Sequence, residues 1–449
     1  MEICPFQGMR YNQRIVGDLA AVICPPYDTI NPEQQRFCYE KSNYNAIRLE
    51  LPLEQPGDSE VNSKYSRAAI TFQQWLKQGI LQTDDCPAFY LHDHYFEYLG
   101  KRKVRRGLIA RVKLEPWGTS IYPHEETFPK AKNDRLQLMR VCQANFSPLF
   151  SLYQDPEQKI ASILAEASQV KPIIDISVSP PLVGEGWGEG DENDIVWAIT
   201  DSSLVCQISH FLAVQPLYMA DGHHRYETAL TYQQERAQVI ASEAKQSLTG
   251  KEAFNYTMME LVEFSDPGLV ILPIHRLVRG IAPPTLAKLE SQLGNFFTLD
   301  FVPLTESSFS HCEQSEAISK MIGAATLGIL GLKPQFLVIL KQRQGVSTET
   351  MMLPNRSRAY KEFSVSFLNH IILDKMLKFT ASKDDIAYTV DINEAYQQIR
   401  GGEYQLAFLS NPPQPEIVKA VVNAKDRLPR KSTYFYPKLP AGLIINPLD

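Results

Sequence analysis

Residues that could together bind an anion stand at the start of one predicted helix: Asp221, Gly222, His223, His224 and Arg225. A strand pattern precedes them and apolar residues at helical spacing follow, so the cations occupy the first helical turn. Unpaired amides and the helix dipole attract anions there, the glycine admits a ligand close to the backbone, and arginine offers a fork of donors. We therefore predict that this turn binds a phosphoryl group. The alternative is that Asp221 only caps a solvent-exposed helix.

A second group of residues could supply acid–base chemistry. His124, Glu125 and Glu126 lie within a few positions of Lys130 and Arg135. The histidine and a glutamate could hold a cation or act as acid and base, and the two basic side chains could contact phosphate. The spacing alone leaves open a structural reading, in which the acidic residues cap the following helix. Our catalytic candidates are His124, Glu125, Glu126, Asp221 and His223.

Two further segments carry weaker signals. Lys431, Ser432 and Thr433 stand in a tail rich in cations, hydroxyls and aromatic rings, which suits a phosphate or a nucleobase and equally suits a docked C-terminal strand. His275 and Arg276 follow a predicted strand. They could add positive charge at the mouth of a cleft, or form a salt-bridged strand end.

His92 and His94 alternate along a predicted strand, which aims both rings at one face, as metal ligands require. No third ligand stands near them in the sequence, so a pair of core or surface histidines is favoured. The chain contains no GxxxxGKS/T, GxGxxG, HExxH or GxSxG motif. The common P-loop, dinucleotide-binding, zincin and hydrolase assignments therefore have no signature support.

Composition limits the classes of partner. The 449 residues are 44% hydrophobic and carry a net charge of -6, so a large core is available and no global basic field attracts nucleic acid or membranes. Any anion site must be local, and the expected partner is a small phosphorylated molecule. The seven cysteines are scattered and odd in number, which indicates reduced thiols. No apolar run approaches the roughly 20 residues of a membrane span, so we expect a cytoplasmic protein.

Hydrophobic periodicity predicts the elements that must position these residues. Helical spacing covers 63–77, and strand patterns at 88–93 and 107–114 predict a hairpin that turns at the basic run 101–103. A β-α-β pattern spans 388–409, with Asp391 as the N-cap of its helix. The other predicted elements are strands at 195–199, 214–219, 255–263, 269–272 and 336–340, and a helix at 363–377.

The pattern predicts three consecutive lobes: 1–155, 156–284 with the strand-turn-helix, and 285–449 with the β-α-β unit. The segment 178–193 is rich in Gly, Pro and Glu, and we interpret it as a flexible surface insertion. Residues 239–250 interrupt a helix-to-strand transition and are interpreted in the same way.

Five segments together resemble the family known as domain of unknown function 1015. They are Pro25-Pro26-Tyr27-Asp28, His124-Glu125-Glu126-Thr127, the stretch from Ala220 to Tyr226, Leu272-Pro273-Ile274-His275-Arg276, and the tail from Lys431 to Lys438. The resemblance adds Tyr27 and Asp28 to the residues expected near the site.

The turn from Asp221 to Arg225 also resembles, more distantly, the signature turn of the ParB and sulfiredoxin superfamily, which includes ADP-dependent free-serine kinases. In that superfamily a Gly-x-His-Arg-like turn before a helix holds nucleotide phosphates. His223 stands where sulfiredoxin carries its reactive cysteine, which disfavours sulfinic-acid reduction. The resemblance implies an α+β, mixed-sheet core of ParB/sulfiredoxin type and phosphoryl transfer that uses Mg²⁺ with ATP or ADP.

Three functions are compatible with these observations. The first is a phosphotransferase or nucleotide hydrolase in which residues 222–225 hold phosphate and Glu125 or Glu126 acts as base or cation ligand. The second is a binding module that senses a nucleotide or metabolite without catalysis. The third is a metal-dependent hydrolase that uses His92, His94, His124 and Glu125.

Overall fold

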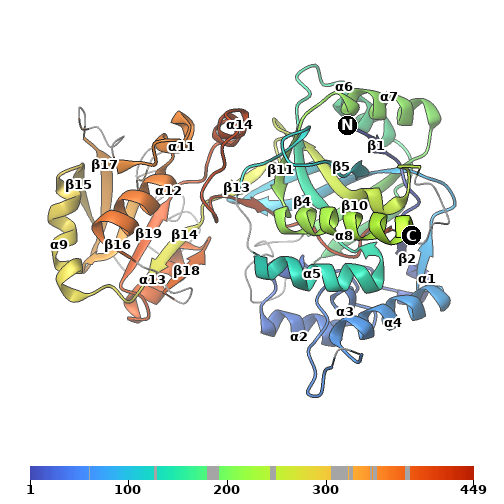
Figure 1. The fold of residues 1–449 in the computed structure, drawn as a ribbon, viewed down its shortest axis with the longest axis horizontal. Helices are drawn as coiled ribbons and strands as arrows, with labels where there is room; N and C mark the ends of the chain where they lie inside the picture. The colour runs from blue at the N-terminus through green and yellow to red at the C-terminus, as the bar shows by residue number, and fades with distance from the viewer. Residues whose placement is uncertain are drawn as a thin grey trace. The chain divides into compact units, whose positions relative to one another are not determined.

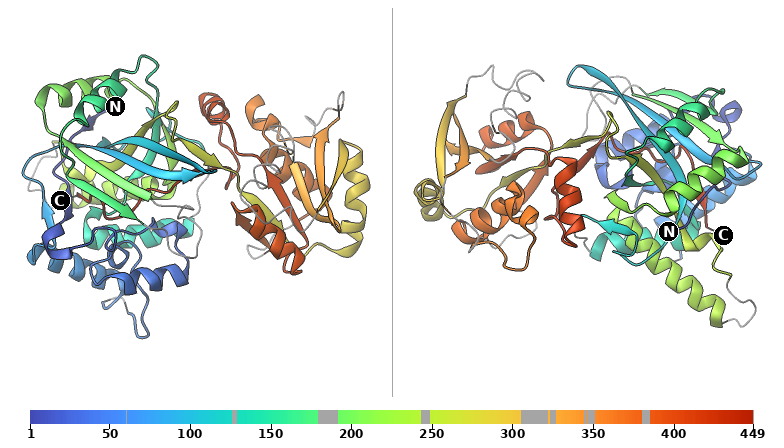
Figure 2. Two further views of the ribbon diagram at one scale, coloured as in Figure 1. Left: turned by 180° about the vertical axis from the view of Figure 1, so that it is seen from behind. Right: turned by 90° about the horizontal axis from the view of Figure 1, so that it is seen from above.

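The computed structural model describes residues 1–59, 61–125, 129–178, 192–242, 249–304, 322, 327–343, 346, 351–379 and 385–448. They form two compact units, which we call unit 1 (Met1–Pro123, Thr127–Leu269 and Pro437–Asp449) and unit 2 (His124–Glu126 and Val270–Tyr436). Figures 1 and 2 show that each unit has its own sheet and helices. Unit 1 draws on most of the chain before residue 270 and on the C-terminal segment, whereas unit 2 lies mostly between residues 270 and 436.

Unit 1 contains a mixed nine-stranded sheet in the order β6-β11-β8-β12-β5-β4-β10-β9, with β1 paired to β5. Its strands are β1 (Ile3–Cys4), β4 (Phe89–Tyr98), β5 (Lys101–Lys113), β6 (Ile121–Pro123), β8 (Leu149–Tyr153), β9 (Ile174–Val178), β10 (Glu192–Ile199), β11 (Leu217–Asp221) and β12 (Tyr256–Glu263). β11 runs parallel to β6, and β8 runs parallel to β12. The short pairs β2 (Met9–Tyr11) with β3 (Leu81–Thr83), and β7 (Ala144–Asn145) with β21 (Asn446–Pro447), complete the strands of this unit.

Helices pack on both faces of this sheet. They are α1 (Gln13–Val16), α2 (Pro32–Lys41), α3 (Ile47–Glu50), α4 (Lys64–Lys77), α5 (Pro129–Cys142), α6 (Lys159–Ala167), α7 (Ser202–Ala213) and α8 (His223–Ser242), with 3-10 turns at Tyr27–Thr29 and Ala253–Asn255. Tyr90 of β4 belongs to a buried apolar cluster with α4 and α5, whereas Leu91 belongs to a second cluster with α6, α7 and α8. Neighbouring residues of one strand thus enter opposite cores, as the alternation of side chains along a strand requires.

The predicted helix at 63–77 is confirmed as α4. Ser63 caps it by accepting a hydrogen bond from the amide of Ser66, and Gly79 follows its last turn with a φ of 71°. The predicted hairpin is also present, but its turn was placed wrongly. Tyr98 pairs with Lys101, so the turn consists of Leu99 and Gly100, both with positive φ, and the basic run opens β5 instead. Glycine at the second position suits such a two-residue turn, which explains the difference.

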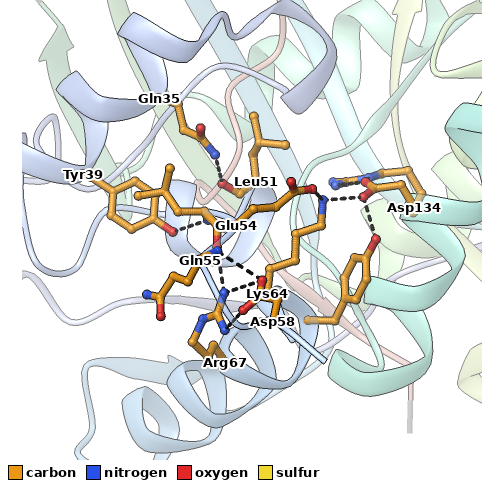
Figure 3. Close-up of polar contacts among 12 residues, drawn as sticks. Gln35, Tyr39, Leu51, Glu54, Gln55, Asp58, Lys64, Arg67 and Asp134 are labelled. Atoms are coloured by element: carbon orange, nitrogen blue, oxygen red, sulfur yellow. Dashed lines mark hydrogen bonds and ion pairs between the residues drawn. The ribbon is translucent and has the colours of Figure 1, made fainter. Parts of the chain in front are cut away.

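Charged side chains hold α5 against the segment that precedes α4. The ammonium group of Lys64 lies 3.0 Å from Glu54 and 3.0 Å from Asp134, and Figure 3 shows the lysine between the two carboxylates. Tyr65 donates to the same aspartate at 2.8 Å. Burial alone would raise the pKa of Asp134, but Arg135, Lys64 and Tyr65 hold that pKa at about 2. These contacts fix α5, the helix that carries Arg135.

Unit 2 is built on a six-stranded antiparallel sheet in the order β15-β17-β16-β19-β14-β18. Its strands are β14 (His275–Val278), β15 (Phe297–Pro303), β16 (Leu327–Lys333), β17 (Phe336–Gln342), β18 (Ile386–Thr389) and β19 (Leu406–Ser410), and β13 (Val270–Leu272) pairs separately with β20 (Tyr434–Tyr436). Its helices are α9 (Pro283–Gly294), α11 (Arg358–Glu362), α12 (Ser364–Phe367), a π-helix (Leu368–Met376), α13 (Ile392–Arg400) and α14 (Pro415–Asn423).

The predicted β-α-β unit is confirmed as β18, α13 and β19, and the side chain of Asp391 caps α13 by accepting from the amide of Asn393. The α+β class is confirmed as well. Most of the proposed insertion 178–193 lies outside the described residues, although Glu192 and Asn193 begin β10. Residues 243–248 of the second proposed surface segment also lie outside them. None of the helices in the described ranges has the length and apolar character of a membrane span.

Candidate functional site

The strand-turn-helix predicted from the sequence is present in unit 1: β11 ends at Asp221 and α8 begins at His223. Gly222 joins them with a φ of +92°. A Cβ atom at this position would lie 2.6 Å from the Leu149 side chain and 3.1 Å from the Arg225 guanidinium. The turn therefore requires glycine for two reasons, its left-handed backbone and the close packing of β8 and α8 around it.

Two cations hold the carboxylate of Asp221. Lys438 donates to Oδ1 at 2.8 Å and Arg225 to Oδ2 at 3.1 Å. Burial alone would raise the pKa of Asp221, but the two cations hold it well below its ordinary value. Asp221 is thus a firmly ionised partner for cations and a weak base. Lys438 was missed as a site residue, although it belongs to the basic tail that the sequence singled out.

Arg225 points into the protein and is only 11% exposed. Its Nη1 donates to the hydroxyl of Ser147 at 2.9 Å and to the carbonyl of Pro148 at 3.0 Å, while its buried Nε has no hydrogen-bond partner. Burial alone would lower the pKa of Arg225, but the charges of Asp28, Asp221 and Glu50 raise it. The guanidinium is therefore a permanent cation, and its Nε–H group has no acceptor.

A cavity of about 50 Å³ lies beside Arg225. Its lining comprises Glu50, Arg135, Leu138, Met139, Ala144, Asn145, Phe146, Ser147, Leu149, Arg225 and Thr257. Arg135 stacks on the ring of Tyr27 at 4.1 Å and donates to the backbone carbonyl of Glu50 at 2.5 Å. Two arginines thus border one small space of mixed polar and apolar lining, large enough for a phosphoryl group and far below the roughly 300 Å³ of a drug-sized pocket.

Glu50 is the buried carboxylate of this cavity, and the sequence reasoning missed it. Its side chain accepts from the Ser147 hydroxyl at 3.1 Å and from the Tyr27 amide at 3.4 Å, and the residue is 3% exposed. It stands in the apolar-rich stretch of α3, where no motif marks it. Asp28 is exposed in the adjacent 3-10 turn.

The two histidines of the turn have different environments. His223 is 8% exposed, and its ring lies 6.1 Å from that of Trp117. His224 is half-buried, and its carbonyl accepts from the Thr228 hydroxyl. Both belong to the first turn of α8, as predicted.

The second predicted group is divided: Arg135 belongs to unit 1 and lines its cavity, whereas His124 and Glu125 belong to unit 2. The carboxylate of Glu125 accepts from the amides of Lys431 at 3.2 Å, Ser432 at 3.0 Å and Thr433 at 3.0 Å. The Thr433 hydroxyl donates to the same carboxylate at 2.9 Å and lies 2.7 Å from Nε2 of the buried His124. Two segments predicted to meet a ligand therefore meet each other. Glu126 and the side chain of Lys130 lie outside the described residues.

His275 and Arg276 lie in the interior of the unit 2 sheet, with exposures of 0% and 2%, and not at an open cleft mouth. Arg276 donates to the carbonyls of Arg430 and Lys431 and so holds the loop that faces Glu125. Burial, and then the charge of Arg276, lower the pKa of His275 to about 3, so this ring is neutral in the folded protein. Both residues belong to the start of β14.

His92 and His94 are fully buried on β4 of unit 1, whereas His124 and Glu125 belong to unit 2. Among the described residues, Asp194 brings a carboxylate oxygen to the pair, and the three donor atoms lie within 4.8 Å of one another. A histidine pair with a carboxylate is a set of residues that could hold a metal ion.

Comparison with known proteins gives one family and several similar structures. The family described as "Protein of unknown function (DUF1015)" matches residues 3–364, and no curated protein matches the chain. A free serine kinase in complex with AMP is 11% identical with a TM-score of 0.34, over 75% of this chain and 91% of its own. A conserved hypothetical protein from Pyrococcus furiosus is 12% identical with a TM-score of 0.31, over 73% and 96%. SbnI with C-terminal truncation from Staphylococcus aureus is 10% identical with a TM-score of 0.31, over 73% and 82%.

Replacing Gly222 by alanine is expected to destabilise unit 1 more than the same change at Gly118. Both glycines have a positive φ, but a Cβ atom at 118 meets nothing within 4 Å. Backbone strain costs about 1 kcal/mol at either position, and overpacking against Leu149 adds about 1–3 kcal/mol at position 222. Urea denaturation followed by tryptophan fluorescence measures both. Equal losses for G222A and G118A would contradict the close packing at the turn.

A second prediction concerns His275 and pH. The unfolded chain takes up a proton near pH 6.5, whereas the folded chain does so only near pH 3. The stabilising contribution of the neutral ring is therefore complete above about pH 6.5. As the pH falls from there toward about 3, the free energy of unfolding decreases by up to about 1.4 kcal/mol per pH unit. His275→Asn keeps an acceptor for the Ser410 amide and should flatten this decline. Denaturation followed by circular dichroism between about pH 7 and 4 tests it, with the exposed His210→Asn as control; an unchanged slope would refute the assignment.

Proposed function

We propose that this chain, which belongs to the family described as protein of unknown function (DUF1015), binds the phosphoryl group of a nucleotide or phosphorylated metabolite beside the 221–225 turn. The match confirms the family resemblance and covers the first four of the five sequence segments. The observation that supports the proposal is the cavity of unit 1, which is lined by the guanidinium groups of both Arg135 and Arg225 and by the hydroxyl of Ser147. Guanidinium groups recognise phosphate oxygens through paired donors.

The charges around this cavity favour a phosphate that arrives with a divalent cation. Arg135, Arg225 and Lys438 are accompanied by the carboxylates of Glu50 and Asp221. A bare phosphate dianion would leave these carboxylates facing like charge, whereas its Mg²⁺ complex adds almost no net charge. Carboxylate oxygens are the ligands that Mg²⁺ prefers. The proposed ligand is therefore ATP or ADP with Mg²⁺, bound through its phosphates.

Each group then has a role in phosphoryl transfer to a small hydroxyl compound or to water. Arg225 and Arg135 hold the phosphate oxygens and stabilise the charge that builds on them. Glu50 accepts the proton of the attacking hydroxyl, because it is buried beside the cavity and its carboxylate accepts from neutral donors, the Ser147 hydroxyl and the Tyr27 amide. Asp28 would hold the Mg²⁺, which would supply charge neutralisation at the transferred group. Asp221 orients Arg225 and Lys438.

A non-catalytic sensor is the second candidate, and the state of Asp221 favours it. A carboxylate that is engaged by two cations and has a lowered pKa is a poor proton acceptor. If Glu50 does not take the proton, the same cavity binds phosphate without turnover. Binding and turnover therefore need separate tests.

Binding is tested by a thermal-shift panel of ATP, ADP, CTP and pyrophosphate with and without Mg²⁺. A ligand at one hundred times its Kd stabilises the folded state by about 2.7 kcal/mol. Arg225→Lys keeps the charge but loses the fork, and we expect the shift to fall by at least half. The exposed Arg14→Ala should respond like the wild type. No shift with any of these ligands, or an equal shift in Arg225→Lys, would rule out phosphate binding at this turn.

Turnover is tested with Glu50→Gln, which preserves the size of the side chain. If Glu50 is the general base, release of phosphate or formation of phosphorylated product should fall about 100-fold or more, while the thermal shift by nucleotide persists. Nucleotide binding without measurable turnover in the wild type would support the sensor. Full activity in Glu50→Gln would exclude this residue as the base.

A further inference from the structure

A buried group of ionisable side chains lies on one face of the unit 1 sheet. Its members are His92 and His94 of β4, Arg105 of β5, Glu192 and Asp194 of β10, and Glu260 of β12, and none is more than 6% exposed. The strand pairing brings them together: His94 is the partner of both Asp194 and Arg105. Residues two apart on a strand share a face, so both histidines and both acidic residues of β10 point to the same side.

The two imidazoles are arranged around one carboxylate oxygen. Oδ1 of Asp194 lies 2.8 Å from Nε2 of His92 and 3.3 Å from Nδ1 of His94. The remaining nitrogen of each ring faces a glutamate: Nδ1 of His92 lies 2.9 Å from Glu260, and Nε2 of His94 lies 3.4 Å from Glu192. Metal-binding histidines typically carry such a carboxylate on the nitrogen that does not bind the metal.

Several polar atoms of this group have no hydrogen-bond partner. Both ring nitrogens of His94 and one carboxylate oxygen of Glu260 are fully buried without one, so the short distances around His94 are contacts of poor hydrogen-bond geometry. A buried polar atom left without a partner costs about 1–3 kcal/mol. The neutral ring of His94 therefore has a nitrogen lone pair that accepts no hydrogen bond and is available to a metal ion.

A glycine leaves room for the contact between Glu260 and His92. β5 lies between β12 and β4, so Glu260 must reach across β5 to contact His92. It does so over Gly107, where a Cβ atom would lie only 2.4 Å from Oε1 of Glu260. Any larger residue at this position would displace the glutamate, so the sheet accommodates the contact by having no side chain there.

The charges of the group do not balance. With both imidazoles neutral, the described members of the group carry three negative charges and the one positive charge of Arg105, an excess of two that burial makes costly. A divalent cation removes this excess. The competing arrangement places a proton on each imidazole instead.

We propose that His92, His94 and Asp194 bind a divalent transition-metal ion of the zinc type, with Glu260 and Glu192 orienting the two imidazoles. The three donor atoms lie within 4.8 Å, and neighbouring ligands of a tetrahedral zinc ion are roughly 3.3 Å apart. Imidazole donors suit zinc, copper, iron or nickel, whereas magnesium, calcium and manganese prefer oxygen donors. Because the ligands are buried, the ion links β4 to β10 and stabilises unit 1, a role distinct from the phosphate site.

The full chain, purified without a metal-affinity step, is stripped with a chelator and titrated with Co²⁺ and with Zn²⁺. We expect one ion per chain by elemental analysis, a visible absorption band for the Co²⁺ form, and a higher melting temperature with either ion. Absence of stoichiometric binding by the refilled wild-type protein would establish the protonated arrangement and overturn the proposal.

Near-isosteric variants locate the site. Asp194→Asn should abolish the Co²⁺ band, and Glu260→Gln should weaken binding about 10–100-fold, because an orienting carboxylate tunes its histidine. The exposed histidine of α7 provides the control His210→Ala, which should bind like the wild type. If Asp194→Asn does not fold, the metal affinity of Glu260→Gln decides whether these residues form the site. Wild-type affinity in Glu260→Gln or in a folded Asp194→Asn protein would overturn the proposal.

Discussion

The pairing of Asp221 with Lys438 and Arg225 joins three parts of unit 1 that are distant in the sequence. The aspartate ends β11, the arginine belongs to the first turn of α8, and the lysine comes from the C-terminal segment. Because the carboxylate is largely removed from water, its charge is stable only while both cations remain in place. The C-terminal segment is thereby held in unit 1, and Arg225 is held at the edge of the cavity that it shares with Arg135.

Each unit contains a carboxylate that is bound by groups that could equally bind an anionic ligand. In unit 1, Asp221 stands among the cations of the turn. In unit 2, Glu125 is bound by the amides of residues 431–433, an arrangement in which successive backbone N–H groups converge on one anion. Donors of this kind in a sequence therefore do not by themselves identify a ligand site, because the chain can supply the anion. The cavity of unit 1 is lined by two arginines, Arg135 and Arg225, and Arg225 keeps an unused buried donor beside it.

Two glycines allow the close approaches on which the interior of unit 1 depends. Gly222 lets β8 and α8 pack around the turn, and Gly107 lets Glu260 pass over β5 to His92. In both places the missing side chain is as much a part of the arrangement as the charged groups. The same sheet thus carries the proposed phosphate site at the end of β11 and the buried histidines in its interior.

The sequence by itself determined the local features. The strand-turn-helix at 221–225, the helix at 63–77, the capping of α13 by Asp391 and the α+β class follow from periodicity and from interactions within a few residues. The turn at Leu99 and Gly100 was missed because the basic run beside it is a stronger compositional signal. Only the tertiary structure decided that Glu50 lies beside Arg225, that Lys438 and not Lys431 reaches Asp221, and that Asp194 and Glu260 surround His92. These contacts depend on strand order and on the return of the C-terminus, which arise from long-range packing that no short window of sequence contains.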